Sequence, residues 1–539
     1  KEPNDLEKKK DLDTKHPAVR NRIVTTNLAA AIKSKPAPLY HSNFKSRIQI
    51  GNFEDDMSKI ADVDWIIEVI VERLDIKKIV FDQVEKHRTP GTLVSSNTSG
   101  IPIKFMNKGR SKDFQEHFTV THFFNPPRYL KLFEVVPGPN CKPEVVDFLM
   151  EYGTRFLGKS AVLAKDTPAF IGNRIGIFCI QSLFHQMKPM GLTVEEVDKL
   201  TGPVIGRPKS ATFRTVDVVG LDTLVHVAKG LHENCPDDER RDCFVLPDFI
   251  QKMMDEQWLG SKSGQGFYKK IKNKDGKSDI QVLDLDSMTY RQNKKASFAT
   301  LEKTKTVERV ADRFPILISG SDKAAKFYRA VFGETFAYVQ YRVPEISDSL
   351  YQIDEAMKAG FGWEHGPFEL WDAVGLTTGI ELIKELGHTV APWIEKLAAN
   401  GATGFYNLKE NKPHYYNLEK EKFLSVPRQE AFIILDHVRE NKTIWQNKEC
   451  SVIDIGDGVL NIEFRSKMNT IGAGVLQGIN KGIDLAEQGY EAIVVGNNGA
   501  NFSAGANLGM IFMMAVEQEY EELNMAIKYF QDTMMRMRY

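Results

Sequence analysis

Four widely spaced side chains could together take a proton from an alcohol. Ser99 follows a short predicted strand, and His122 ends another. Glu134 lies in the next predicted strand, beyond a proline-containing turn, so it could pair with His122 from the side. A carboxylate beside an imidazole fixes the tautomer and makes the ring a better proton acceptor. With Asn173 near the start of a predicted helix, the set indicates a site that holds a hydroxyl group and removes its proton.

Each of these residues also has a purely structural explanation. A histidine beside two phenylalanines at a strand end is commonly a buried residue with satisfied hydrogen bonds, and Glu134 could be an ion-paired core carboxylate. Ser99 and Asn173 carry little information singly. Residue chemistry alone therefore leaves catalysis and structure open as explanations.

The elements that would position these residues alternate between strand and helix. Apolar, β-branched runs predict strands, the first of them buried on both faces, at 65–71, 92–95, 118–122 and 131–136. An amphipathic helix is expected over 74–85. This alternation predicts an α/β doubly wound domain, whose ligands bind outside the carboxyl ends of the strands.

A mainly helical region follows and is repeated. Asp166-Thr167-Pro168 offers an N-cap and a proline in the first turn, so we expect a long helix from there towards Met187. Residues 206–223 and 362–378 share a glycine, an aromatic residue and the pattern Asp-x-Val-Gly-Leu in the same order. This recurrence predicts a duplicated helical unit.

Composition excludes several classes of protein. The 539 residues include 71 Lys+Arg and 72 Asp+Glu, a net charge of −1, which argues against a basic nucleic-acid-binding surface. No apolar run of about 18 residues predicts a membrane span, and no secretory signal opens the chain. The five cysteines are scattered without CxxC spacing, which favours a reducing cytoplasm and no metal site.

Four ordered motifs resemble the 3-hydroxyacyl-CoA dehydrogenase family over about residues 1–395: SNTSG, HFFNPPRYLKLFEVV, KDTPAFIGNRIG and GQGFYKK. The resemblance implies NAD-dependent oxidation of (3S)-3-hydroxyacyl-CoA to 3-oxoacyl-CoA in fatty-acid β-oxidation. It makes His122 the base that takes the 3-hydroxyl proton and Glu134 the carboxylate that orients it. Ser99 and Asn173 would then hydrogen-bond the substrate oxygens.

The resemblance also implies cofactor-side contacts. Glu72 and Lys77 match positions that contact the nicotinamide ribose and the CoA substrate, and Asn125 and Lys262 match further cofactor contacts. The family's Gly-x-Gly-x-x-Gly turn after a first strand is not found in this sequence, so we expect the chain by itself to bind NAD weakly.

A second set of three glycines has a spacing similar to that of the NAD-binding turn. Gly472, Gly474 and Gly478 lie in a helical pattern rather than after a strand, and we interpret them as structural.

The C-terminal segment resembles the crotonase (enoyl-CoA hydratase/isomerase) family. FRSKMNTIG is similar to its early acyl-CoA-binding stretch, and NFSAGANL is similar to its first oxyanion-hole loop. The resemblance makes the backbone N–H of Ala506 an oxyanion donor, although Asn507 replaces the usual Asp. The family's later catalytic residues would lie beyond Tyr539. The order of dehydrogenase and then crotonase resembles the bacterial fused type, and the chain reads as a fragment truncated at both ends.

The expected fold is an incomplete Rossmann-type domain, duplicated all-α dehydrogenase C-terminal domains and a partial crotonase-like α/β domain. We expect an NAD-binding domain without its first strands and glycine loop over 1–164 and a helical domain over 165–270. A linker over 271–324 would lead to a second helical repeat over 325–395. A connection over 396–450 would precede the crotonase part over 451–539. The expected partner is an acyl-CoA thioester, with a homodimer or a thiolase complex left open. The alternative function is a non-catalytic acyl-CoA-binding scaffold that has lost the cofactor loop.

Overall fold

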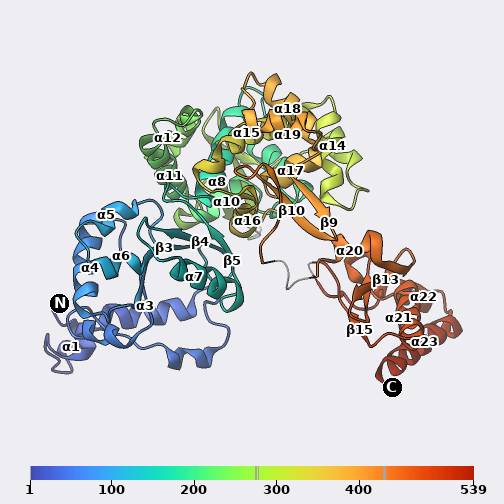
Figure 1. Cartoon of the computed structure of the whole chain (residues 1–539), viewed down its shortest axis with the longest axis horizontal. Coiled ribbons are helices and arrows are strands. Elements are labelled where there is room, and N and C mark those ends of the chain that lie inside the picture. The colour runs from blue at the N-terminus through green and yellow to red at the C-terminus, as the bar shows by residue number, and fades with distance from the viewer. Residues whose placement is uncertain (1, 273–275, 277, 429–432, 500) are drawn as a thin grey trace. The chain divides into compact units, whose positions relative to one another are not determined.

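Strands and helices alternate over residues 65–163 to form a five-stranded sheet of order β1-β2-β3-β4-β5. The first three strands run parallel, β4 is antiparallel to β3, and β5 runs parallel to β4. The strands are β1 (Trp65–Glu68), β2 (Leu93–Ser96), β3 (Phe118–Phe123), β4 (Leu132–Pro137) and β5 (Ser160–Leu163). The computed structural model describes residues 2–272, 276, 278–428, 433–499 and 501–539 (Figure 1).

Neighbouring residues of a strand point to opposite faces of this sheet, and apolar side chains on both faces pack against helices. Val94 and Phe118 are register partners, and Phe118 packs with Phe81 and Phe114 of one helical layer. Leu93, on the other face, packs in a cluster with residues of the opposite layer. The helices of this domain are α4 (Leu74–His87), α5 (Ile103–Asn107), α6 (Lys112–Glu116) and α7 (Pro143–Arg155).

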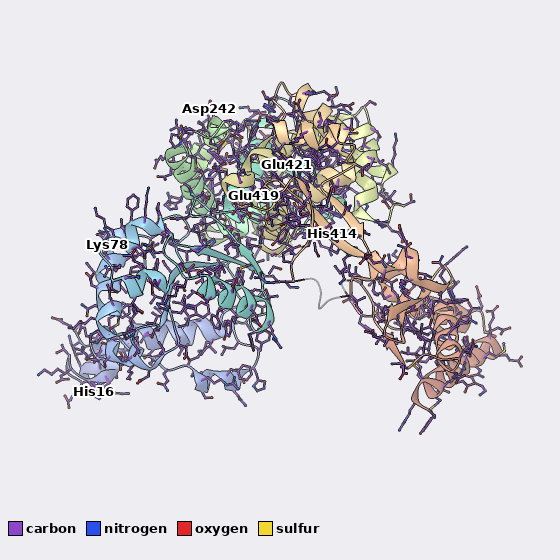
Figure 2. All side chains as sticks on the ribbon, viewed as in Figure 1. His16, Lys78, Asp242, His414, Glu419 and Glu421 are labelled. Carbon is purple, nitrogen blue, oxygen red and sulfur yellow. The ribbon has the colours of Figure 1, made fainter. Side chains whose placement is uncertain are left out.

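The segment before the sheet is largely exposed and is built of short helices. They are α1 (Asp5–Lys8), α2 (Pro17–Arg20), α3 (Arg22–Lys33), η1 (Ser42–Arg47) and η2 (Met57–Asp62). Arg128 holds part of this segment by donating hydrogen bonds to the carbonyls of Ala37 and Leu39, at 2.7 and 2.9 Å. His16, Lys78 and Asp242 lie at the outer surface in different parts of the molecule (Figure 2), in keeping with a surface of mixed charge.

The helical region after the sheet contains two copies of one unit. The first copy consists of α8 (Gly172–Met187), α9 (Val194–Leu200), η3 (Pro203–Ile205), α10 (Phe213–Val219), α11 (Leu221–Asn234), η4 (Arg241–Phe244), α12 (Asp248–Asp255) and η5 (Ser261–Ser263). The second consists of α15 (Lys323–Glu345), α16 (Leu350–Phe361), α17 (Pro367–Val374), α18 (Leu376–Glu385) and α19 (Pro392–Ala399). The long helices α8 and α15 pack against each other.

The two copies share backbone features that the sequence repeat predicts. Gly206 and Gly362 both adopt a left-handed conformation, with φ of 67° and 66°. Asp217 of the first copy accepts a hydrogen bond from the backbone N–H of Phe267, and Asp372 of the second accepts one from Phe405 in the same way. The repeat therefore extends further than the sequence comparison indicated, to a Gly-Phe-Tyr turn that follows each copy.

The stretch 271–324 was expected to be a linker, but its described residues are mostly in regular elements. A three-stranded antiparallel sheet precedes two helices: β6 (Tyr268–Lys272), β7 (Ser278–Asp284), β8 (Thr289–Gln292), α13 (Ala299–Lys303) and α14 (Val310–Ser319). Val282, Leu283 and Phe314 are buried, so this polar, lysine-rich stretch still contributes apolar side chains to the core. Residues 273–275 and 277 of the expected linker lie outside the described residues.

The chain divides into two compact units, residues 1–405 with 416–422, and residues 406–415 with 423–539. Three short strands lie near the boundary: β9 (Tyr406–Lys409), β10 (Lys412–Asn417) and β11 (Lys422–Ser425). In the first unit Glu421, labelled in Figure 2, forms an ion pair of 2.6 Å with Lys396. Residues 429–432 of the expected connection lie outside the described residues.

The second unit contains a four-stranded sheet of order β12-β13-β14-β15. Its elements are α20 (Leu435–Lys442), β12 (Thr443–Gln446), β13 (Cys450–Gly456), β14 (Val459–Phe464), η6 (Lys467–Asn469), α21 (Ala473–Ala486), β15 (Ala492–Val495), α22 (Leu508–Val516) and α23 (Tyr520–Arg538). Cys450, Ile462 and Ile479 are among the residues of its buried core. No helix in the described part of the chain is long and apolar enough to cross a membrane.

Candidate active site

His122 and Glu134 face each other across two antiparallel strands. The two residues are direct register partners of β3 and β4, and His122 Nδ1 lies 2.6 Å from Glu134 Oε2. Both side chains are buried, with Glu134 wholly inaccessible. The side-by-side pairing predicted from the sequence is therefore present, and it arises because the connection between the strands sets their register.

The carboxylate of Glu134 is held by more than the histidine. Its second oxygen, Oε1, accepts hydrogen bonds from the backbone N–H groups of Ile171 and Gly172, at 3.0 and 2.8 Å. These amides stand at the N-terminus of α8, where unpaired N–H groups and the helix dipole favour a negative charge. Both oxygens of Glu134 therefore have hydrogen-bonding partners, and Oε2 is placed to accept the Nδ1 proton of His122.

The start of α8 differs from the sequence expectation. The helix begins at Gly172 rather than after Thr167, because Ala169 and Phe170 adopt left-handed conformations with φ of 63° and 50°. Such values are unfavourable for residues with side chains. The turn they form directs the first helical amides at Glu134, and it places Asn173 as the second residue of the helix.

Aromatic rings enclose the pair. The rings of Phe124 and Phe170 lie edge-on to the His122 ring, with centroids 5.1 and 5.6 Å away. Gly172 has no room for a side chain, since a Cβ there would come within 2.7 Å of the Phe124 ring. The glycine therefore allows the helix start and this ring to approach the pair together, and the rings exclude water from most of the imidazole.

The turn that precedes α8 borders a cleft of about 390 Å³, which neither His122 nor Glu134 lines. Ser99 and Glu72 lie on one side of it, Pro168 and Ala169 border it, and α11 supplies the remaining wall. Ala169 precedes Phe170, the ring that contacts His122. The structure therefore brings Ser99 to the cleft, whereas His122 and Asn173 do not line it. Asn173 lies next to the glycine that binds Glu134.

Glu72 and Lys77 occupy different environments. Glu72 is about a third exposed at the cleft and accepts hydrogen bonds from the Thr98 hydroxyl and, at 3.0 Å, from the Ser99 backbone N–H. Lys77 is only 1% exposed, and its ammonium lies 2.9 Å from both carboxylate oxygens of Glu68. Lys77 lies behind Glu72 in this structure, and its expected contact with CoA or cofactor stays a prediction. Glu68, which the sequence analysis missed, is its main partner.

The other two expected cofactor contacts stand at the surface. Asn125 lies in the exposed loop after β3. Lys262 is about half exposed and forms an ion pair with Asp222 at the start of α11. The structure does not bring either residue into hydrogen-bonding contact with the His122–Glu134 pair.

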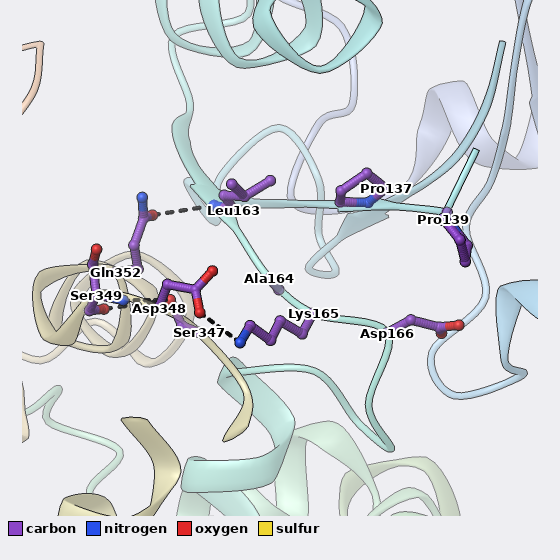
Figure 3. Close-up of a pocket in the computed structure, with 11 residues that line it drawn as sticks. Pro137, Pro139, Leu163, Ala164, Lys165, Asp166, Ser347, Asp348, Ser349 and Gln352 are labelled. Carbon is purple, nitrogen blue, oxygen red and sulfur yellow. Dashed lines mark hydrogen bonds and ion pairs between the residues drawn. The ribbon is translucent and has the colours of Figure 1, made fainter. Parts of the chain in front are cut away.

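Residues of the KDTP motif have a structural task as well. A pocket of about 290 Å³ lies between the ends of β4 and β5 and the turn before α16, where Lys165 forms a 2.5 Å ion pair with Asp348 and Gln352 accepts from the Leu163 N–H (Figure 3). Burial raises the pKa of Asp166, whose carboxylate accepts from the Ile103 N–H. The contacts of Lys165 with Asp348 and of Leu163 with Gln352 join the sheet domain to the second helical copy, a task that the sequence did not indicate.

In the second unit Ala506 follows a left-handed glycine, Gly505, with φ of 81°. Ile471 N–H donates to the Gly505 carbonyl at 2.9 Å, and the Asn507 side chain caps α22 by accepting from the Met510 N–H. Among the described residues none accepts a hydrogen bond from the Ala506 N–H. Hydrogen bonds thus hold the loop at both ends, and the Ala506 N–H has no acceptor among the described residues.

Comparison with known proteins identifies the first unit. A family model described as the 3-hydroxyacyl-CoA dehydrogenase NAD-binding domain matches residues 10–167, and the model of that family's C-terminal domain matches twice, over 170–270 and 330–408. A 3-hydroxyacyl-CoA dehydrogenase of Bacillus subtilis (strain 168) is 43% identical over 100% of this chain and 68% of its own length. The chain belongs to the 3-hydroxyacyl-CoA dehydrogenase family. It is an NAD-dependent oxidoreductase, and the double match agrees with the structural duplication.

Two further comparisons concern the length of chain over which relatives match and the fold that is shared. A fatty acid oxidation complex trifunctional enzyme of Rickettsia felis is 28% identical over 96% of this chain and 68% of its own length. The crystal structure of a 3-hydroxybutyryl-CoA dehydrogenase from Escherichia coli K12 covers 71% of this chain and 92% of that chain, with a TM-score of 0.52 and 20% identity. The latter shows a shared fold.

The residues of this dehydrogenase fit one end of NAD. Glu72 presents a partly exposed carboxylate at the cleft beside Ser99, which suits the hydroxyls of a ribose. The sequence contains no pyrophosphate-binding glycine turn after a strand. Gly474 and Gly478 lie within α21, where a Cβ would collide with Glu449 and Cys450, so the structural interpretation of these glycines is confirmed.

Proposed function

We propose that this protein oxidises (3S)-3-hydroxyacyl-CoA to 3-oxoacyl-CoA in fatty-acid oxidation, with His122 as the base. The hydrogen bond between His122 and Glu134 carries the proposal, because it produces a buried imidazole with a fixed orientation. The trifunctional relatives from fatty acid oxidation complexes support this pathway assignment.

The tautomer of His122 follows from its partner. An ionised Glu134 accepts the proton on Nδ1, so Nε2 is left as the unprotonated nitrogen. Nε2 would take the proton of the substrate 3-hydroxyl while the C3–H bond breaks and its electron pair leaves as hydride, which turns the C–O bond into a carbonyl. NAD supplies the hydride acceptor when bound. The resulting imidazolium is stabilised by the carboxylate at 2.6 Å.

The other site residues would position the reactants. Ser99 would hydrogen-bond the substrate oxygens from the cleft wall, and Asn173 would do so from the first turn of α8. Glu72 would hold the nicotinamide ribose, with Asn125 and Lys262 as outer cofactor contacts. Each of these assignments follows the family resemblance.

We further propose that the second unit is the first part of an enoyl-CoA hydratase/isomerase-like domain, with the Ala506 N–H as an oxyanion donor. The spare amide beside a left-handed glycine supports this. The match to the trifunctional relative over 96% of the chain extends into this unit. A cytoplasmic location and a homodimer or thiolase complex remain predictions.

A His122→Gln variant tests the dehydrogenase proposal. We expect NADH formation from a (3S)-3-hydroxyacyl-CoA to fall by about 10²- to 10⁴-fold, because glutamine cannot take the proton. Acyl-CoA and NADH binding, followed by calorimetry, should change little. Loss of binding together with activity would mean that His122 is structural, and acyl-CoA binding without any turnover by the unaltered protein would favour a scaffold.

A further inference from the structure

Phe361, the last residue of α16, belongs to the second helical copy but lies against the first helix of the first copy. The helices α16 and α8 pack against each other (Figure 1). Gly176 of α8 has no room for a side chain, because a Cβ there would come within 2.0 Å of the Phe361 ring. The ring therefore lies directly on the helix backbone, about one turn after Asn173.

The same ring is connected to His122 through Phe124. The centroids of the Phe361 and Phe124 rings are 6.0 Å apart, and the Phe124 centroid lies 5.1 Å from that of His122. Two glycines allow this approach: a Cβ on Gly172 of α8 would come within 2.7 Å of the Phe124 ring, and a Cβ on Gly360 of α16 within 3.3 Å. The second copy therefore supplies a side chain that is two ring contacts away from the proposed base.

A small, mostly apolar recess of about 30 Å³ lies along α8 beyond Asn173. Its walls include Ile180 of α8 and, from the second copy, Phe361 and Trp363. Ile180 follows Asn173 by seven residues, which places both on one face of the helix. Arg207 also borders the recess, and its guanidinium lies over the Trp363 ring, 3.7 Å from the centroid. The volume is that of about one water molecule, so the Phe361 ring fills much of the space on this face.

The duplicated fold does not by itself explain a partly exposed ring at this position. Gly206 and Gly362 are equivalent in the two copies, so the counterpart of Phe361 is Ile205. Ile205 is only 5% exposed, whereas Phe361 is half-buried. A large aromatic side chain gains less from partial burial than from full burial. Its place at the recess therefore indicates a task other than filling the core.

We propose that Phe361 is a specificity-determining residue, which packs against the acyl chain of the substrate beyond C3 and favours chains long enough to reach it. This rests on the proposed function, in which His122 and Asn173 contact the oxygen on C3. From that point the apolar face of α8 leads to the Phe361 ring within about one helical turn. An alkyl chain gains free energy by leaving water for such a surface.

A Phe361→Ala variant tests this proposal through the dependence of NADH formation on chain length. With 3-hydroxyhexadecanoyl-CoA we expect kcat/KM to fall about tenfold, and with 3-hydroxybutyryl-CoA less than about twofold, because only the long chain loses a contact. Phe361→Leu keeps an apolar side chain and should show a weaker loss, and it serves if the alanine variant does not fold.

A matched control is Trp393→Ala, which removes another half-buried aromatic ring of the second copy, one whose indole donates to the Gln340 carbonyl. The control should lower thermal stability while leaving the ratio of the two kcat/KM values unchanged. An equal fall with both substrates in Phe361→Ala would make the ring structural. A rise with the long substrate would mean that the ring obstructs the chain, and either result overturns the proposal.

Calorimetry with the saturated thioesters hexadecanoyl-CoA and butyryl-CoA separates this proposal from the proposed function, because neither compound carries a 3-hydroxyl group. We expect Phe361→Ala to weaken binding of hexadecanoyl-CoA about tenfold and to leave that of butyryl-CoA nearly unchanged. If the unaltered protein forms no NADH, the proposed function fails, but this difference in binding still decides whether the ring contacts the chain. Binding of neither thioester by the unaltered protein would overturn both proposals.

Discussion

At the scale of single residues, the site depends on one buried carboxylate with three partners. Glu134 binds His122 with one oxygen and two helix amides with the other. A buried carboxylate is costly without hydrogen-bonding partners, and here every partner also fixes geometry. The residue therefore orients the imidazole and sets the position of the helix start at the same time.

Replacing Glu134 by glutamine should separate these two tasks. The amide oxygen can still accept from Ile171 and Gly172, but its NH₂ group would face His122 Nδ1 and favour the tautomer with a protonated Nε2. We expect kcat to fall by about 10²- to 10⁴-fold with acyl-CoA affinity little changed. Glu151→Gln, on an exposed part of α7, is the control. An unchanged kcat would contradict the assigned pairing.

At the scale of elements, the duplicated units use an aspartate to hold the turn that follows each copy. Asp217 accepts from the Phe267 and Tyr268 N–H groups, both at 2.9 Å. Burial raises the pKa of Asp217 to about 6, although these two backbone hydrogen bonds lower it in part. Its folded pKa therefore lies above its unfolded value of 3.8, so folding takes up a proton between these two values.

This pKa shift predicts how stability depends on pH. The contribution is fully present below about pH 4 and is lost as the pH rises through about 6, which should lower the free energy of unfolding by about 1–3 kcal/mol. Asp217→Asn should make this part of the pH profile less steep in denaturant titrations, with a remaining slope from Asp198, whose pKa burial also raises to about 6. The variant should lower stability at every pH, since asparagine accepts at one oxygen only. Asp286→Asn, on an exposed side chain, should leave the slope intact. A slope unchanged in Asp217→Asn would show that another group produces it.

At the scale of the whole molecule, the first unit contains most of the candidate site residues and also a sheet with an exposed edge. The first unit holds the buried His122–Glu134 pair, a cleft and two helical copies. Its sheet has β1 at one edge, since β1 pairs only with β2 among the described strands. Val69, just after β1, is 67% exposed. An open apolar edge of this kind promotes association between chains.

A lysine at the edge should reduce this association. We expect Val69→Lys to raise the concentration at which the protein aggregates, measured by light scattering, while changing the free energy of unfolding by less than about 0.5 kcal/mol. Val218→Lys is the control, because Val218 is 73% exposed on helix α10. Equal improvement in both variants would mean that net charge, and not the edge, limits solubility.

The sequence by itself determined the order of elements, the duplicated helical unit and the family. Strand composition and the ordered motifs are local properties of the chain, so residues 118–122 and 131–136 were recognisable as strands in advance. Only the tertiary structure decided the late start of α8, the order in the expected linker and the burial of Lys77. The start of α8 depends on a partner distant in sequence, because the helix amides donate to Glu134. The burial of Lys77 depends on Glu68, which accepts from the ammonium that the family resemblance assigns to cofactor and substrate contacts. Hydrogen bonds and ion pairs in a core are settled by which groups meet there, and a single-chain pattern does not contain that information.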